Sequence, residues 1–347
     1  MAFKTFRLAI AALVLTVFIT ACQNDRISRA LSPETGEFYS SDALSSTRSG
    51  HSEEERKLQA DFDAFCTELF RKEMESSSTL DLHYTLLHPE NYGIDAEDAA
   101  LGTYRLSELI KNSREIHDLK LSEFDPHMLS DDQQILYDSL SERIETGLMA
   151  EGLELYDQPL APTIGIQAQL PILLAEYSFH SLQDVEDYLT LLSHLDSYYG
   201  DILYFEEQKA AAGLGPSDAS IERILESCQS YLIDPVNNFL TETFETRLNS
   251  LSTDISLSEQ QKNNFRSRHL EVIKNSFLPA YRHLINGLSG LKGRGINEGG
   301  LCGFRDGRQY YEYLLRSGPG LSYNIEELKA ALSDRMQKDL ETISSLS

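Results

Sequence analysis

Apolar residues recur every three to four positions along most of the chain from about residue 56 onward, which is the spacing of one face of an α-helix. The first stripe consists of Leu58, Phe62, Phe65 and Leu69. A longer one, expected to be a single helix ending near Gly213, consists of Val185, Tyr188, Leu192, Leu195, Tyr199 and Ile202. The last consists of Ile325, Leu328, Leu332, Met336, Leu340 and Ile343. The pattern predicts a mainly α fold, built as a multi-helix array.

Polar residues mark where several of these helices should begin. In a capping box, two side chains three positions apart each bond the other's backbone N–H. Such boxes are predicted at Ser130 with Gln133, Ser181 with Asp184, Ser258 with Gln261, and Asn324 with Glu327. Asp234 and Pro235 are interpreted as a cap followed by Pro at the first helical position. Pro279 is expected to kink the long helix that begins after Ser258.

Two stretches interrupt the helical pattern. Residues 159–166 are a turn region rich in Pro and Gly that leads into a short apolar run. Residues 293–308 contain six glycines and the sequence Arg305-Asp306-Gly307, and an Asp-Gly pair between short runs is typical of a β-hairpin. We therefore expect at most one small β-hairpin in an otherwise helical chain.

The beginning of the chain is predicted to be a signal peptide, residues 1–21. Lys4 and Arg7 precede an apolar run over residues 8–19, and about 12 apolar residues are too few to span roughly 30 Å of hydrocarbon. The run ends in Ile19-Thr20-Ala21-Cys22, which resembles a bacterial lipobox and implies a lipid on Cys22. Two acyl chains would anchor the protein stably. The alternative is an ordinary cleaved signal with a chance cysteine.

The next segment, residues 22–56, is rich in Ser, Thr, Gly, Asp and Glu and lacks apolar periodicity. We expect it to be the lipidated Cys22 and a flexible tether. The helical domain then comprises residues 57–347 and is expected to be incomplete. On this interpretation, the protein lies on the extracytoplasmic face of a bacterial cell membrane and is held there by its lipid.

The charge balance narrows the set of partners. The chain carries 30 Lys and Arg against 55 Asp and Glu, a net charge of −25, which argues against a nucleic-acid binder because phosphate contacts need clustered cations. It argues equally against a peripheral protein held to the membrane by electrostatics. Beyond Cys22, Cys66 and Cys228 lie among apolar residues and are expected in the core, and Cys302 makes the count odd, so at least one is unpaired in the chain.

Motifs that carry chemistry are absent from the sequence. It contains no HExxH, GxSxG, GxxxxGK[ST] or GxGxxG, and no catalytic or metal-ligating residue is assigned to the chain. His83 and His88 are five positions apart, which points them to different faces of a helix. The acidic pair Glu206-Glu207 is interpreted as a solvated surface. The tyrosine pairs Tyr198-Tyr199 and Tyr310-Tyr311 could line a cleft, but a tyrosine on a helix stripe is more typical of a core.

Several segments, in order, resemble a known family. They are residues 160–174, 179, 184–192, 278–281, 284, 300–301, 306–311 and 314–316. Together they are similar to the N-terminal half of the bacterial domain-of-unknown-function family 885 (DUF885), many of whose members are lipoproteins. The resemblance implies the first half of a larger helical fold, similar to that of the gluzincin peptidases.

Those peptidases hold zinc with the two His of HExxH and a later Glu, and a zinc-bound water attacks the peptide. The family's zinc helix lies downstream of Tyr310 and Tyr311, so no ligand can be assigned here. The resemblance implies zinc only in a complete member. It also implies that this chain is an N-terminal portion, inactive alone, which forms a helical wall of the substrate channel. Asp306, Tyr310 and Tyr311 are the candidates for facing that channel, and a turn residue is the alternative for Asp306.

Two functions remain open at this point. One is the N-terminal portion of a lipid-anchored zinc metallopeptidase, a hydrolase whose substrates would be peptides. The other is a non-catalytic surface lipoprotein that binds peptides or a protein partner.

Overall fold

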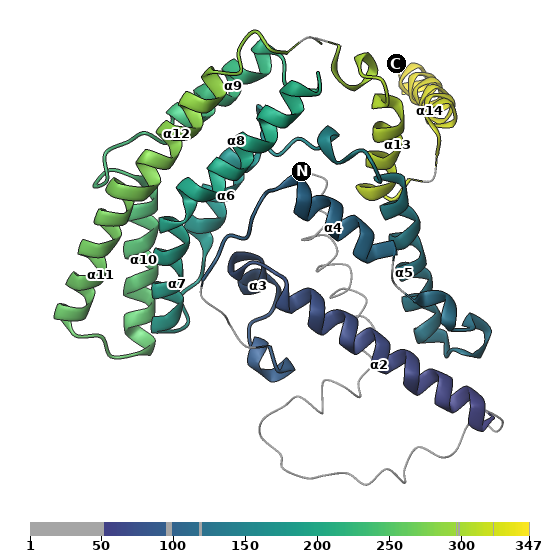
Figure 1. Ribbon diagram of the computed structural model, residues 1–347, viewed down its shortest axis with the longest axis horizontal. Coiled ribbons are helices and arrows are strands. Elements are labelled where there is room, and N and C mark those ends of the chain that lie inside the picture. The colour runs from purple at the N-terminus through teal and green to yellow at the C-terminus, as the bar shows by residue number, and fades with distance from the viewer. Residues whose placement is uncertain are drawn as a thin grey trace.

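The computed structural model describes residues 52–94, 99–117, 120–295, 297, 299–321 and 323–346. Within these ranges every regular element is a helix and no strand occurs (Figure 1). The prediction of a mainly α multi-helix array is therefore confirmed. The signal peptide, Cys22 and the tether up to residue 51 lie outside the described residues.

The helices fall into three successive groups along the chain. The first group is α2 (Glu53–Glu75), α3 (Thr79–Thr85), α4 (Leu106–His117) and α5 (Asp131–Met149). The second is α6 (Ile166–Glu176), α7 (Leu182–Ser193), α8 (Leu195–Ala211), α9 (Asp218–Gln229), α10 (Phe239–Asp254), α11 (Glu259–Val272) and α12 (Leu278–Ser289). The third is α13 (Gly307–Ser317) and α14 (Ile325–Leu346).

Helices α6 to α12 pack into a bundle that contains the main core. Helix α12 packs along α8 and α9, α10 along α6, and α11 along α7. Aromatic side chains fill much of the interior, among them the fully buried Tyr188, Tyr199, Phe205, Phe244 and Tyr281. Beside this bundle, α2 and α5 enclose a smaller cluster, and α13 packs against α5 (Figure 1).

The predicted helix starts are mostly confirmed by side-chain hydrogen bonds. All four capping boxes form: Ser130 with Gln133, Ser181 with Asp184, Ser258 with Gln261, and Asn324 with Glu327. A fifth, Ser52 with Glu55, starts α2 at Glu53, inside the segment predicted to be tether. The prediction at Asp234 is wrong, because its carboxylate closes a turn by accepting from the Val236 N–H, and α10 begins only after Asn238.

The stripe that follows Ser181 is carried by two helices rather than the expected one. The His194 N–H is shared between the carbonyls of Thr190 and Leu191, at 3.2 Å each, which tightens the last turn of α7 before α8 begins. Helix α8 then ends at the predicted glycine. Gly213 has φ +76° and, with Leu214, closes a Schellman motif on the carbonyls of Ala210 and Lys209.

The irregularities predicted at Pro279 and Gly307 have different outcomes. A π-helical turn, Ile273–Phe277, separates α11 from α12 just before Pro279, whose missing N–H cannot continue the ladder of hydrogen bonds. Gly307 does not form a hairpin. A Cβ there would lie 1.7 Å from the Leu301 carbonyl oxygen, so the glycine allows the first turn of α13 to pack against η7 (Gly300–Gly303).

Candidate functional site

The three residues predicted to face a channel lie at the start of α13, but they do not share a surface. Tyr310 is buried, with its ring centroid 5.5 Å from that of Tyr156 and 5.6 Å from that of Tyr313. Tyr311 is the next residue of the helix, points away from this cluster, and is 41% exposed. Of the two tyrosines, only Tyr311 therefore presents a surface to a neighbouring molecule or segment.

Asp306 lies directly before α13 and is held by a tyrosine from another part of the chain. Its backbone N–H donates to the Tyr156 hydroxyl over 3.0 Å, and that hydroxyl lies 3.5 Å from its carboxylate. The Asp306 carboxylate does not cap the helix, although it stands at the N-cap position. Asp306 and Tyr310 are thus brought together around Tyr156, and their predicted role in a channel remains a prediction.

Beneath α13 the structure contains a buried polar cluster, which we define as Tyr104, Asp157, Glu206, Lys209 and Tyr310. Each of these side chains is at most 4% exposed. The Lys209 ammonium donates to the Asp157 backbone carbonyl over 2.6 Å and to the Glu206 carboxylate over 3.3 Å. The Tyr104 hydroxyl donates to the Asp157 carboxylate. The cluster ties α8 to the segment before α6 and to α13.

Burial controls the protonation of this cluster. It raises the pKa of Glu206 above its ordinary value, an effect that the Lys209 ammonium opposes. One Glu206 carboxylate oxygen has no hydrogen-bond partner, which is costly in a buried site. Burial, with the charge of Asp157 added, also raises the pKa of the Tyr104 and Tyr310 hydroxyls. The cluster has almost no contact with solvent, so it can hold elements together but cannot reach a substrate.

The burial of Glu206 corrects the interpretation of Glu206-Glu207 as a solvated pair. Glu206 lies four positions after Ile202 and seven after Tyr199, so it continues the buried face of α8. Lys209 follows at the next turn of the same face. The spacing of the stripe locates both residues on the buried face, whereas their charge suggests a solvated position.

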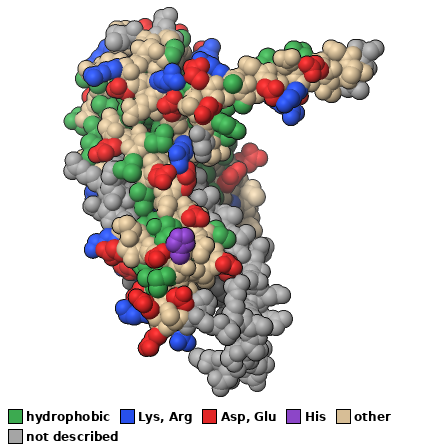
Figure 2. All heavy atoms as spheres, turned by 90° about the vertical axis from the view of Figure 1, so that its right-hand side faces the viewer, with side chains coloured by type: hydrophobic (Ala, Val, Ile, Leu, Met, Phe, Trp, Pro, Cys, Tyr) green, Lys and Arg blue, Asp and Glu red, His purple; other side chains and the backbone are tan. Residues whose placement is uncertain are grey.

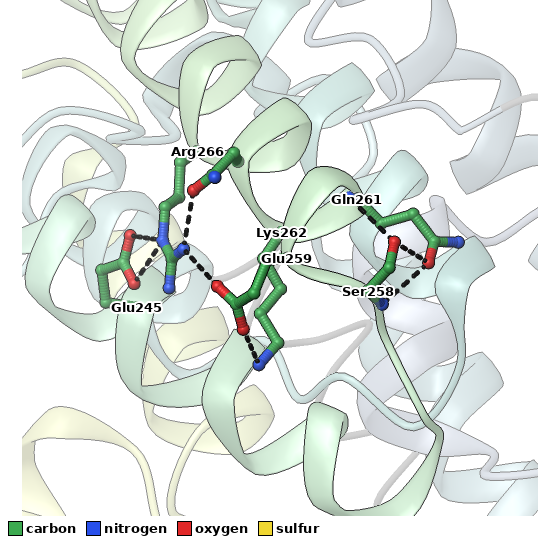
Figure 3. A network of polar contacts seen from close by, with 7 residues as sticks. Glu245, Ser258, Glu259, Gln261, Lys262 and Arg266 are labelled. Atoms are coloured by element: carbon green, nitrogen blue, oxygen red, sulfur yellow. Dashed lines mark hydrogen bonds and ion pairs between the residues drawn. The ribbon is translucent and has the colours of Figure 1, made fainter.

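Another polar network lies on the surface where α10 and α11 meet (Figure 3). Arg266 Nε donates to both Glu245 carboxylate oxygens, at 2.8 and 3.0 Å, and Lys262 donates to Glu259 over 3.0 Å. These side chains are partly exposed and their charges are paired within the network. Such pairs contribute little to stability, and this one joins two helices rather than forming a ligand site.

Helix α14 carries the most exposed apolar surface of the described chain. Leu332, Met336, Leu340 and Ile343, which we call the α14 stripe, are 55%, 65%, 62% and 63% exposed. Figure 2 shows α14 extending from the body as an arm. Contiguous exposed apolar surface of this kind marks an interaction site.

The described residues contain no ready metal centre. No group of three or more His, Cys, Asp or Glu side chains among them is placed to hold a metal ion. The His83 ring stacks on the Tyr177 ring with 3.7 Å between their centroids, while His88 pairs with Glu90 on the surface. His269 is buried against Phe244.

The cysteines of the described chain are free thiols. Cys66 and Cys228 are buried, as predicted, and Cys302 is exposed. Burial raises the pKa of Cys66 and of Cys228 to about 12, which keeps both protonated and chemically inert. No helix within the described ranges has the length and apolar character needed to cross a membrane.

Comparison with known proteins adds a family and a fold neighbour. The model of the family described as "Bacterial protein of unknown function (DUF885)" matches residues 92–344. The fold is similar to that of a "putative lipoprotein" from Colwellia psychrerythraea, with a TM-score of 0.55 at 15% identity. That similarity covers 77% of this chain and 47% of the other, so this chain spans about half the length of its structural relative. No curated protein matches the sequence.

Proposed function

This chain belongs to the bacterial DUF885 family, and from that premise we propose that it is the N-terminal portion of a lipid-anchored, extracytoplasmic zinc peptidase. Its own part in such a protein is structural: a rigid helical wall beside the catalytic half. Zinc and peptide hydrolysis belong to the complete protein.

The extent of the fold match carries this proposal. The similarity covers most of this chain but only 47% of the structural relative, so a protein of that fold contains roughly as much chain again. In the gluzincin-like arrangement that we propose for the complete protein, the zinc ligands lie beyond the positions of Tyr310 and Tyr311. The side chains described here do not fit a zinc site, because no three suitable donors meet. No catalytic step is therefore assigned to this chain.

The lipid anchor is supported by the sequence around Cys22 and by the description of the structural relative as a lipoprotein. It is tested by growing cells that express the full chain with radiolabelled palmitate. We expect label in the membrane fraction for the native chain and for Cys302→Ser. That variant is the matched control, because it removes an exposed thiol other than that of Cys22. Cys22→Ser should lose the label, and a labelled Cys22→Ser protein would contradict the anchor.

The peptidase part is tested by comparing two purified products. One is this 347-residue chain, and the other is the longer product that the proposal expects from the same reading frame in the source genome. We expect about one zinc and chelator-sensitive peptide hydrolysis only in the longer product. Chelator-sensitive hydrolysis by the 347-residue chain would overturn the division of roles proposed here.

The alternative is a non-catalytic lipoprotein that binds a protein partner or peptides. The exposed α14 stripe is the observation that favours it, since it offers a binding surface that needs no metal. A longer product that binds peptides but neither holds zinc nor hydrolyses them would support this alternative.

A further inference from the structure

The α14 stripe has the geometry of a surface that packs against another folded body. Its residues are spaced by four, four and three positions, and Ile325 and Leu328 extend the same face toward α13. The mean spacing from Ile325 to Ile343 is 3.6 residues, which keeps the stripe straight along the helix. At 1.5 Å per residue, the whole apolar face from Ile325 to Ile343 runs for about 27 Å.

Two copies of α14 are poorly suited to pair as a coiled coil. A coiled-coil seam repeats every 3.5 residues. A seam that starts with Ile325, Leu328 and Leu332 would continue through Arg335, Asp339 and Thr342, which are all polar. Arg335 and Asp339 already form an ion pair at 3.1 Å. The apolar positions instead match a straight contact with a helical surface.

A lipid surface is equally poorly suited as the occupant. Helices that lie on bacterial lipid are usually rich in Lys and Arg on the polar face, because the headgroups are anionic. Helix α14 contains three basic residues (Lys329, Arg335 and Lys338) and five acidic ones (Glu326, Glu327, Asp334, Asp339 and Glu341). Its own charge therefore opposes insertion into the interface.

We propose that the α14 stripe is the docking site for the helical half of the family fold that this sequence does not contain. This rests on the proposed function, since it names the partner that the helical wall meets. The structural relative supplies the argument for the occupant. More than half of the relative's chain lies outside the match, and in the relative the matched and unmatched parts belong to one polypeptide. The exposed apolar stripe on α14 is where such further chain would pack.

The test uses the purified 347-residue chain and, as the probe, the polypeptide that the proposal expects to be encoded in frame after Ser347, expressed separately. Leu332→Gln with Met336→Gln removes half of the stripe but keeps residues that favour a helix. The matched control is Asp334→Gln with Lys338→Gln, which replaces an exposed ion pair of 2.7 Å on the opposite face. Sedimentation velocity gives the stoichiometry, and a titration gives the affinity.

We expect a one-to-one complex that the stripe variant weakens at least tenfold and the control changes less than about twofold. Equal weakening by both variants, or by neither, overturns the proposal, as does the absence of any encoded continuation. A dimer of the chain alone that the stripe variant dissolves would assign the stripe to a second copy. Binding of the native chain, but not of the stripe variant, to phosphatidylglycerol vesicles would assign it to lipid.

The same samples separate this proposal from the peptidase proposal. A complex that depends on the stripe but holds no zinc and hydrolyses no peptide leaves the docking site standing and removes the catalytic role. A zinc-containing, active complex that is indifferent to the stripe variant does the reverse.

Discussion

Two helical stripes with the same spacing have opposite surroundings in this molecule. The stripe of α7 and α8 is buried completely, and Val185, Tyr188, Leu192 and Leu195 are at most 1% exposed. The α14 stripe is more than half exposed at every position. Apolar periodicity therefore reports which face of a helix must be covered, but not whether this chain covers it.

The buried face of α8 also contains charged side chains, whereas the charged side chains of α14 lie in solvent. Helix α8 continues its buried face with Glu206 and Lys209, which the interior must satisfy by hydrogen bonds. On α14, by contrast, charged residues are solvated and pair with each other along the helix. The two regions should thus respond in opposite ways to changes of polar and of apolar residues.

The largest effect is expected for Lys209→Met. Removing the ammonium leaves Glu206 and the Asp157 carbonyl buried without their partner, which typically lowers the free energy of unfolding by about 3–5 kcal/mol. Urea unfolding followed by circular dichroism measures it. Lys292→Met is the control, because its ion pair with Glu222 is exposed and should contribute about 0–1 kcal/mol. Equal losses for the two variants would mean that the buried polar cluster does not hold the fold together.

The comparison of the stripes is tested directly with two Leu→Ala substitutions. Leu192→Ala leaves a cavity in the main core and should lower the free energy of unfolding by about 2–5 kcal/mol. Leu340→Ala, which removes the same atoms from an exposed position, should change it by less than about 0.5 kcal/mol in this chain alone. A loss at Leu340 that matches the loss at Leu192 would show that α14 is covered in solution.

Much of the helical framework could be predicted from local chemistry. Capping boxes depend on residues three positions apart, and all four predicted pairs form. The errors have two different causes. A hairpin is predicted at Gly307 because the sequence does not show its tertiary contact with the Leu301 carbonyl. A solvated position is predicted for Glu206 because the residue is charged, although the spacing of the α8 stripe places it on the buried face. The sequence predicts the stripe on α14 as a helix face, but its exposure depends on which other elements pack against it.

Stability should depend on pH because of His269, a polar residue buried in the bundle of α6 to α12. Burial between Phe244 and Tyr188 lowers its pKa from 6.5 to about 3. Between these values the unfolded chain binds a proton that the folded chain does not, so stability falls as the pH falls below 6.5. From pH 6.5 to pH 4.5 the loss from this residue should be about 2–3 kcal/mol.

The variant His269→Phe keeps the stacked ring and removes the proton site, so its stability should fall less over the same pH range. The measurement is the difference in unfolding free energy between native chain and variant at pH 6.5 and at pH 4.5. His88→Phe serves as the control, because its ring is exposed and pairs only with Glu90. Parallel pH curves for native chain and His269→Phe would show that His269 is not held neutral.

The smallest expected effect tests whether α13 and α14 unfold together with the packed helices. Arg316 joins α13 to α5 by donating to Glu142 over 2.6 and 2.7 Å and to Glu145 over 2.8 Å. Because these partners are largely exposed, Arg316→Met should lower the free energy of unfolding by about 1 kcal/mol or less. The loss should shrink in 1 M salt, where the screening length is about 3 Å. Arg335→Met, which removes an ion pair within α14 itself, should have no measurable effect on global unfolding, since that helix is not packed on the core. A salt-sensitive loss at Arg316 alone would show that α13 unfolds cooperatively with the packed helices and that α14 does not. Equal losses at Arg316 and Arg335 would show that α14 belongs to the same cooperative unit.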